Sequence, residues 1–186
     1  MSDDYHYFLQ YACLDNRSLY GAPVMMSRHP ELCQYIETVL ANAKPFLVQG
    51  LAERIVCNVF DNEKLSESYV FEIKRIGEDT DEGTSDADTL LYDTEMQLRD
   101  LLLRTMALEW QMPGHSDDGR SFRLLVHLRD SSKATGALQS GSWMVATSGE
   151  VDANISTSAD VLPLRSVVST GMQFQLYALH EGHSIS

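Results

Sequence analysis

The spacing of apolar residues predicts two helices in this chain. Pro30 and Glu31 open the first, because proline fits the first helical position and an acidic side chain suits the first turn. We expect Pro45 to end it, since the residue before a proline avoids helical dihedral angles. A longer helix is predicted for residues 90–110 and stops before the next proline. The stripe that the first helix buries recurs at helical spacing: Leu32, Ile36, Val39, Leu40 and Ala43.

Alternation of apolar and polar residues predicts five strands. The first two form a β-hairpin through turn residues 61–64. In the last strand Phe174 and Leu176 share one face, whereas Gln175 and Tyr177 share the other. The five predicted strands cover residues 53–60, 69–73, 122–128, 161–168 and 172–179.

Two stretches lack regular periodicity. Residues 77–88 are acidic and rich in Gly, Ser and Thr, so we expect a mobile loop. Residues 131–160 are similarly polar, apart from an apolar cluster at Trp143. The resulting order is helix, hairpin, helix, strand, irregular stretch and closing strands. This order predicts an α+β fold with a mainly antiparallel sheet and helices packed on one face.

Composition narrows the functional classes. The chain of 186 residues is the size of one domain and carries a net charge of −13. Its 14 basic residues are dispersed, so direct binding to a nucleic-acid backbone is not expected. The N-terminus lacks a secretory signal, and no apolar run approaches the roughly 18 residues of a membrane span. Three widely spaced cysteines predict reduced thiols: Cys13, Cys33 and Cys57.

Candidate chemistry is sparse. Ser131 and Lys133 lack the spacing of an acyl-enzyme motif, and no glycine-rich phosphate loop is present. His180 and His183 form an incidental pair rather than a metal site, and the acidic pair 117–118 does not match a calcium loop. The sequence offers no defensible set of a nucleophile, a general base and a group that orients the base. We therefore expect no enzyme, no metal and no cofactor.

A few residues leave two interpretations open. Trp143 is either pinned into the core or part of a binding pocket, where tryptophan is enriched. Tyr35 lies beside the buried stripe of its helix, at the edge of the core or in a site. Gln175 and Tyr177 face either solvent or a partner.

Several segments, in order, resemble the HORMA-domain family over residues 20–180. The branch that they most resemble comprises the accessory HORMA subunits of translesion DNA polymerase zeta. The segments are Pro23–Ile36, Lys44-Pro45, Tyr69–Ile73, Phe122–Arg129, Trp143, Leu162–Leu164 and Gln175–Tyr177.

The resemblance implies a non-catalytic adaptor with a mobile C-terminal safety belt, here about residues 131–165. The belt wraps over a partner peptide that adds to the sheet as a strand. In this branch the peptide contains proline and comes from the polymerase zeta catalytic subunit, and the matching pocket residues are Tyr35 and Trp143. A second surface, matching Val161, Gln175 and Tyr177, docks the C-terminal domain of the scaffold translesion polymerase.

The resemblance also matches Arg99 to a position used in dimerisation of HORMA protomers. It implies a role in DNA damage tolerance and a nuclear location, with cytoplasmic presence left open. Residues 1–19 do not match the long first helix of the family, so we expect a divergent N-terminal segment followed by the HORMA domain at 20–186.

Two functional alternatives use the same belt. One is a spindle-checkpoint-like regulator that binds a co-activator of the anaphase-promoting ligase, and the other is a double-strand-break end-protection subunit. A small α+β hydrolase is a third, disfavoured hypothesis, because the sequence offers no acid–base pair for it.

Overall fold

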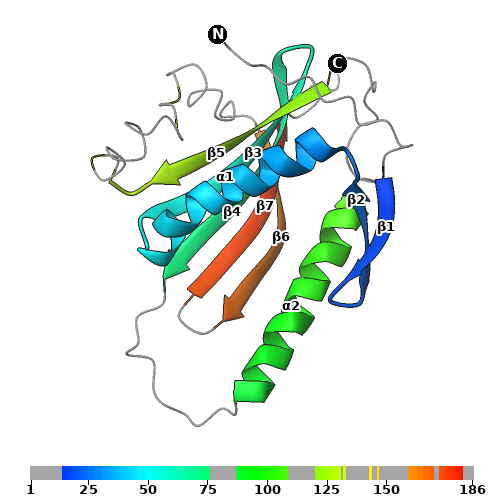
Figure 1. Ribbon diagram of the computed structural model, residues 1–186, viewed down its shortest axis with the longest axis vertical. Coiled ribbons are helices and arrows are strands. Elements are labelled where there is room, and N and C mark those ends of the chain that lie inside the picture. Colours follow the sequence, from blue (N-terminus) through cyan, green and yellow to red (C-terminus); the bar gives the residue numbers. More distant parts are fainter. Residues whose placement is uncertain are drawn as a thin grey trace.

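The structure confirms the α+β class. It is a computed structural model that describes residues 14–75, 87–108, 120–130, 132, 143, 146, 159–169 and 172–181. Nine elements follow one another in the described part of the chain (Figure 1). They are β1 Leu14–Leu19, β2 Ala22–Ser27, α1 Pro30–Val48, β3 Ala52–Asp61, β4 Lys64–Arg75, α2 Ala87–Leu108, β5 Arg120–Leu128, β6 Ala159–Ser169 and β7 Met172–Glu181.

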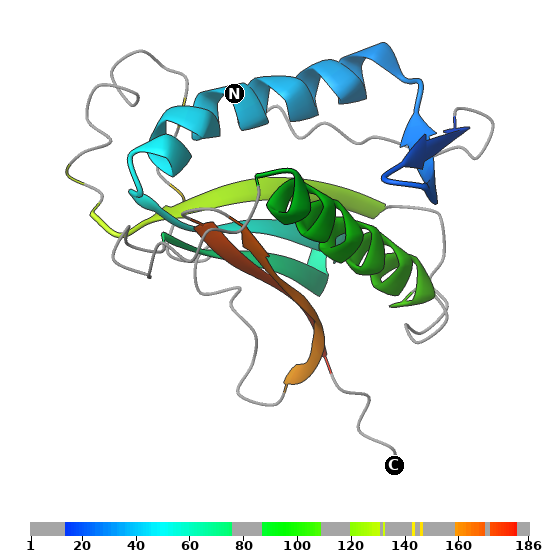
Figure 2. The same cartoon turned by 90° about the horizontal axis from the view of Figure 1, so that it is seen from below.

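The larger sheet has five antiparallel strands in the order β5-β3-β4-β7-β6. Strand β5 therefore lies at one edge and β6 at the other. Both helices lie on the same face of this sheet, which we call the inner face (Figure 2). The predicted hairpin is confirmed as β3–β4, and the closing strands are confirmed as β6–β7.

The main core lies between α2 and the β6–β7 side of the sheet. Leu101 and Leu108 of α2 pack against inner-face residues of both strands, and Val167 is fully buried. The core set is Leu101, Leu108, Leu164, Val167, Leu176 and Ala178. A smaller cluster on the opposite, outer face contains Val56, Val70 and Leu179, with Leu125 and Tyr177 packed against it.

Helix α1 begins at Pro30 as predicted, but the expectation that Pro45 ends it is wrong. The helix continues to Val48, since the Pro45 carbonyl still accepts a hydrogen bond from the Gln49 N–H at 3.1 Å. Proline removes its own N–H from the helical ladder and its ring crowds the carbonyl four residues before it, but the residues after Pro45 still make their helical hydrogen bonds. Gly50 ends the helix instead, with a φ of 68° that favours glycine.

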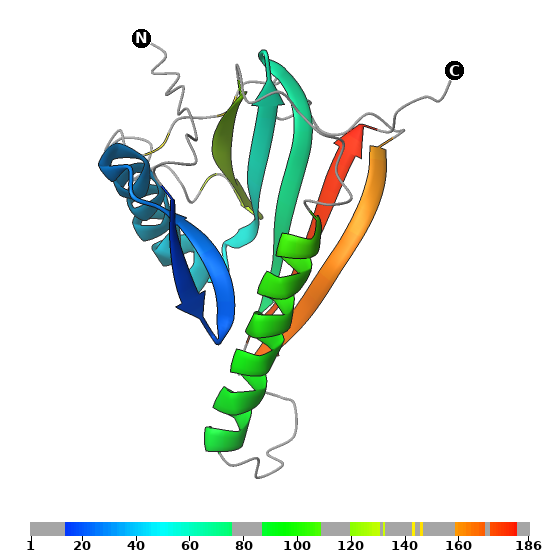
Figure 3. The ribbon, with the colours of Figure 1, turned by 90° about the vertical axis from the view of Figure 1, so that its right-hand side faces the viewer.

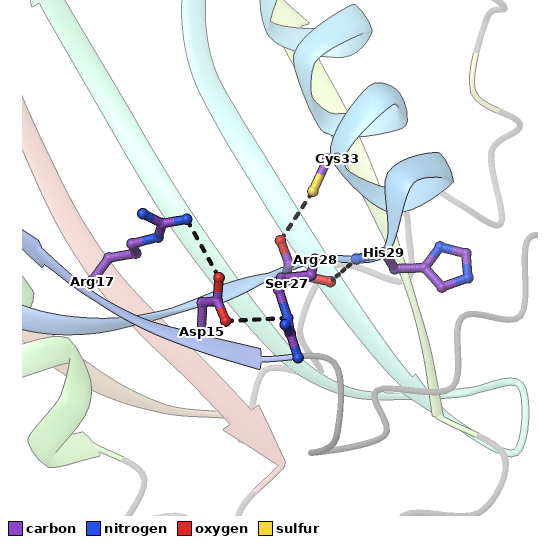
Figure 4. A network of polar contacts seen from close by, with 6 residues as sticks. All are labelled: Asp15, Arg17, Ser27, Arg28, His29 and Cys33. Atoms are coloured by element: carbon purple, nitrogen blue, oxygen red, sulfur yellow. Dashed lines mark hydrogen bonds and ion pairs between the residues drawn. The ribbon is translucent and has the colours of Figure 1, made fainter.

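Strands β1 and β2 form a separate hairpin that the sequence pattern did not reveal (Figure 3). The turn at Tyr20 and Gly21 has positive φ at both residues, and the predicted domain boundary between residues 19 and 20 falls there. Polar contacts tie the hairpin to the start of α1 (Figure 4). The His29 N–H donates to Ser27 Oγ at 3.1 Å, and Cys33 Sγ donates to the Ser27 carbonyl at 3.1 Å.

The predicted mobile loop 77–88 lies outside the described residues, except for Ala87 and Asp88, which begin α2. The predicted belt also lies mostly outside them, and its last residues, from Ala159 onward, belong to β6. Cys33 and Cys57 are free thiols, and Cys13 lies outside the described residues. Neither described helix is long and apolar enough to cross a membrane.

Candidate functional site

The edge of β5 carries the first candidate site. Tyr35 of α1 reaches this edge, where its hydroxyl accepts a hydrogen bond from the Leu124 N–H at 3.5 Å. Its ring packs edge-on against Phe122, with centroids 5.9 Å apart and planes at 67°. Burial raises the pKa of Tyr35, so the side chain stays a neutral phenol.

The Leu124 N–H shows which backbone groups of β5 face away from the sheet. Because it bonds to Tyr35, it does not point toward β3, and backbone direction alternates along a strand. Phe122 and Val126 therefore present their N–H and C=O groups to the same open side. Among the described residues, no strand pairs with this side. The edge can accept an added strand through these groups.

Trp143 contacts the far end of the helix that carries Tyr35. Its ring packs against Phe46 near the end of α1, with centroids 6.3 Å apart and planes at 64°. Phe46 follows Tyr35 by three helical turns, which is about 16 Å along α1. The end of α1 also meets the end of β5, since the Arg129 N–H donates to the Leu51 carbonyl at 2.9 Å. Tyr35 thus contacts β5 directly, whereas Trp143 contacts the part of α1 that leads toward the end of this strand.

A buried ion pair fixes the beginning of β5. Arg120 lies 2.9 Å from a carboxylate oxygen of Glu67 on β4, and Tyr69 donates to the other oxygen at 2.8 Å. Glu67 is only 5% exposed, and burial, followed by its charge, raises the pKa of Tyr69. The pair reaches across β3, so β5 is anchored to two strands.

The interior beneath this edge is not arranged for nucleophilic chemistry. Cys57 of β3 pairs with Leu124, and burial, with a smaller effect of Glu67, raises the pKa of the Cys57 thiol to about 11. Such a thiol stays protonated and unreactive near neutral pH. Within the described ranges, no group of histidine, cysteine and carboxylate side chains could hold a metal ion.

Val161, Gln175 and Tyr177 form a second candidate site on the outer face. Tyr177 and Gln175 alternate with the inner-face residues of β7, as predicted. Val161 joins them because it pairs with Leu179, two residues along the strand, and it is 59% exposed. Gln175 is exposed and Tyr177 half-buried. The register thus brings all three onto one face, away from both helices.

Arg99 packs against the β1–β2 hairpin. The Arg99 guanidinium lies against Gly21, and glycine is favoured at this turn because its φ is 72°. Several apolar side chains of α2 are exposed near this position along the helix: Leu91, Tyr92, Met96, Leu103 and Met106. Arg99 therefore lies within an apolar surface of α2 and holds the hairpin beside it.

Contacts at the β6 edge were missed by sequence reasoning. The Gln97 amide of α2 accepts a hydrogen bond from the Val168 N–H at 3.0 Å and donates to the Val168 carbonyl at 3.3 Å. Arg165 lies 3.3 Å from Asp100 of the same helix. These residues are about 70 positions apart in the chain, and no local pattern connects them.

Comparisons with known proteins agree with this architecture. No family model matches the chain. The mitotic spindle assembly checkpoint protein MAD2B of Danio rerio is 30% identical over 166 residues, which cover 87% of this chain and 75% of the relative. MAD2B of Homo sapiens is 29% identical over 172 residues, covering 90% and 78% of the two chains.

Solved structures show the same fold. A chain from the crystal structure of the mitotic checkpoint complex superposes with a TM-score of 0.75 at 13% identity, covering 94% of this chain and 87% of that one. Caenorhabditis elegans HTP-2 bound to the HIM-3 closure motif gives 0.69 at 8% identity, with 92% and 80% covered. The HORMA fold expected from the sequence is confirmed.

Proposed function

Because the chain belongs to the MAD2B family of HORMA-domain proteins, we propose that it is an adaptor of translesion DNA synthesis. It clamps a proline-containing peptide of the DNA polymerase zeta catalytic subunit and docks the C-terminal domain of the scaffold translesion polymerase. In this role it acts in the nucleus and supports DNA damage tolerance. Members of the family are non-catalytic adaptors, and HORMA proteins bind closure-motif peptides and other partner proteins.

The observation that carries the proposal is the open edge of β5. Tyr35 lies at this edge, and Phe46, which Trp143 contacts, lies about 16 Å farther along α1, the length of about five residues of an extended peptide. Backbone groups of the edge can form hydrogen bonds with a peptide of any sequence. The aromatic rings add packing surfaces suited to proline. The edge therefore fits an extended peptide better than a globular partner.

Chain connectivity supports a clamp. Strand β5 ends at one edge of the sheet, and the next strand, β6, lies at the opposite edge. The two edges are about 19 Å apart for strands spaced by about 4.8 Å. Residues between them must connect the two edges, and Trp143 of this connection lies against α1. A connection of this kind can enclose a peptide at β5, which slows its dissociation.

The second partner is assigned to the outer face. Val161, Gln175 and Tyr177 combine an exposed apolar side chain, an amide and a phenol. Such mixed surfaces suit a protein partner. This face lies on the opposite side of the sheet from α1 and Tyr35, so both partners can bind at once.

A second candidate function is suggested by the relatives' name, mitotic spindle assembly checkpoint protein. The same β5 edge would then bind a co-activator of the anaphase-promoting ligase. A third partner class, a double-strand-break end-protection complex, would use the same edge. Capture from nuclear extract followed by mass spectrometry ranks the three partner classes directly, and a predominance of ligase co-activators would overturn the polymerase assignment.

Two substitutions test the two-site arrangement. Trp143→Ala should abolish binding of the polymerase zeta peptide, measured by fluorescence anisotropy, but leave binding of the scaffold domain unchanged. Tyr177→Ala should do the reverse. Thermal melts of both variants check that the fold is retained. Loss of both partners in both folded variants would contradict the assignment of separate sites.

A further inference from the structure

Strand β5 is rich in basic side chains in an otherwise acidic protein. Strand β5 carries two arginines and a histidine but no acidic residue, whereas the whole chain has a net charge of −13. Arg123 and His127 both lie on the outer face, four residues apart, since they alternate with the inner-face residues that meet Tyr35. A peptide added to β5 would place its outward side chains beside them.

Arg123 is oriented by the ring of Phe60. Its guanidinium carbon lies 5.2 Å from the ring centroid, in a cation–π contact. Its register partner on β3 is Asn58, which is neutral, and Ser68 follows Asn58 on β4. A stacked guanidinium keeps its N–H groups in a plane at the rim of the ring, which is the geometry that a carboxylate recognises.

A second cation lies farther along the same face. Arg54 of β3 pairs in register with His127 on one side and with Glu72 on the other. Its Nε is buried and has no hydrogen-bond partner. Burial, followed by the charge of Arg54, lowers the pKa of His127, whereas Glu53 opposes this effect. Arg54 thus adds a second guanidinium to this face, with Glu72 beside it, whereas burial favours the neutral form of His127.

The two arginines near the ends of β5 lie away from the position of Arg123. Arg120 is engaged with Glu67 on the inner face, and Arg129 donates to the Ile73 carbonyl at 3.1 Å. Arg123 is thus the arginine of β5 whose charge lies on the outer face in the middle of the strand. The inner positions on either side of it, Phe122 and Leu124, are apolar.

We propose that the peptide bound at β5 carries an acidic side chain at the position facing Arg123, with apolar side chains at the positions before and after it. This inference rests on the proposed function, because it specifies the chemistry of the peptide at that site. Side chains directly opposite each other in paired strands have Cβ atoms about 5 Å apart, within reach of an ion pair. The acidic residue sets the register of the peptide, and the apolar residues face α1.

The experiment uses the proline-containing peptide of the polymerase zeta catalytic subunit. Asp, Asn and Lys are placed in turn at each position, and dissociation constants are measured by fluorescence anisotropy on the full chain. We expect one position at which Asp binds about tenfold more tightly than Lys, with Asn between them. Arg123→Glu should reverse this order of affinities at the same position. Arg123→Gln should make the affinities of the Asp, Asn and Lys peptides equal there.

A matched control separates local pairing from net charge. Arg104→Gln removes one positive charge from an exposed position of α2 and should preserve the Asp preference. Equal binding of Asp, Asn and Lys at every position would overturn the inference and leave the proposed function standing. If no peptide of the series binds the folded chain, the proposed function fails, and the inference falls with it.

Discussion

The two edges of the sheet differ in how their backbone groups are satisfied. At β6, the Gln97 amide bonds both backbone groups of Val168, as a neighbouring strand would, and Pro163 has no N–H to offer. At β5, the Tyr35 hydroxyl accepts a hydrogen bond from the Leu124 N–H at 3.5 Å, and the strand contains no proline. A register shift near Pro163 also distorts β6.

This contrast distinguishes an edge that is protected from one that is available. Proteins block exposed edge strands with prolines, irregular pairing and covering elements, because an open edge pairs with other chains. The described part of β6 combines these features, whereas β5 has no proline and its pairing with β3 shifts register only near its end, between Ala52 and Arg54. Among the described strands, β5 is therefore the edge better suited to strand addition.

The largest expected effect comes from proline in β5. Val126→Pro removes an N–H from the open side and should weaken peptide binding by about 10- to 100-fold, since an unpaired buried carbonyl costs about 1–3 kcal/mol. Val126→Ala controls for the lost packing and should weaken binding less. Val161→Pro, at the β6 edge, should leave peptide affinity unchanged, as titration by anisotropy will show. Equal losses at both edges would abolish the distinction between them.

A smaller effect is expected when the protection of β6 is removed. Gln97→Ala leaves the Val168 backbone without its partner and should lower the free energy of unfolding by about 1 kcal/mol. Urea denaturation measures this loss. Gel filtration should also detect self-association through the newly open edge. Gln34→Ala, at an exposed site of α1, provides the control, and identical stability of the two variants would show that Gln97 does not protect β6.

The smallest expected effect is a pH dependence at β5. The pKa of His127 is lowered in the free protein, and a peptide of the Asp series whose carboxylate lies opposite His127, rather than opposite Arg123, would raise it in the complex. The complex then binds more protons than the free chain, so affinity should rise as the pH falls through the range between the two pKa values. Titrations between about pH 8 and pH 5.5 should show a few-fold gain. In the His127→Gln variant the profile should be flat, and an unchanged slope would refute this origin.

Local patterns were sufficient to predict most of the sheet and both helices. The β3–β4 hairpin follows from alternation around a turn at Asn62 and Glu63, which both adopt positive φ. The β1–β2 hairpin was missed because Leu14–Leu19 does not alternate, and Gly21 was its only turn signal. The end of α1 was misplaced because Pro45 lies where its missing N–H is tolerated.

The candidate site was less accessible to sequence reasoning. Tyr35 and Trp143 were predicted as peptide contacts only through the family resemblance, and nothing in their spacing placed Tyr35 at the β5 edge or Trp143 against Phe46. Gln97 and Val168 meet because α2 packs on β6, a contact between distant segments. Likewise, the pairing of Glu67 with Arg120 spans 53 positions. Such contacts form only when the sheet is assembled, so the pattern of neighbouring residues in the sequence does not predict them.

The Glu67–Arg120 ion pair also has a mechanical consequence. A peptide tethered to a moving polymerase would pull along β5 and load its hydrogen bonds with β3 in shear. Peeling β5 away would also separate this ion pair, which joins it to β4 across β3. We therefore expect tension to release the peptide before it unravels the sheet.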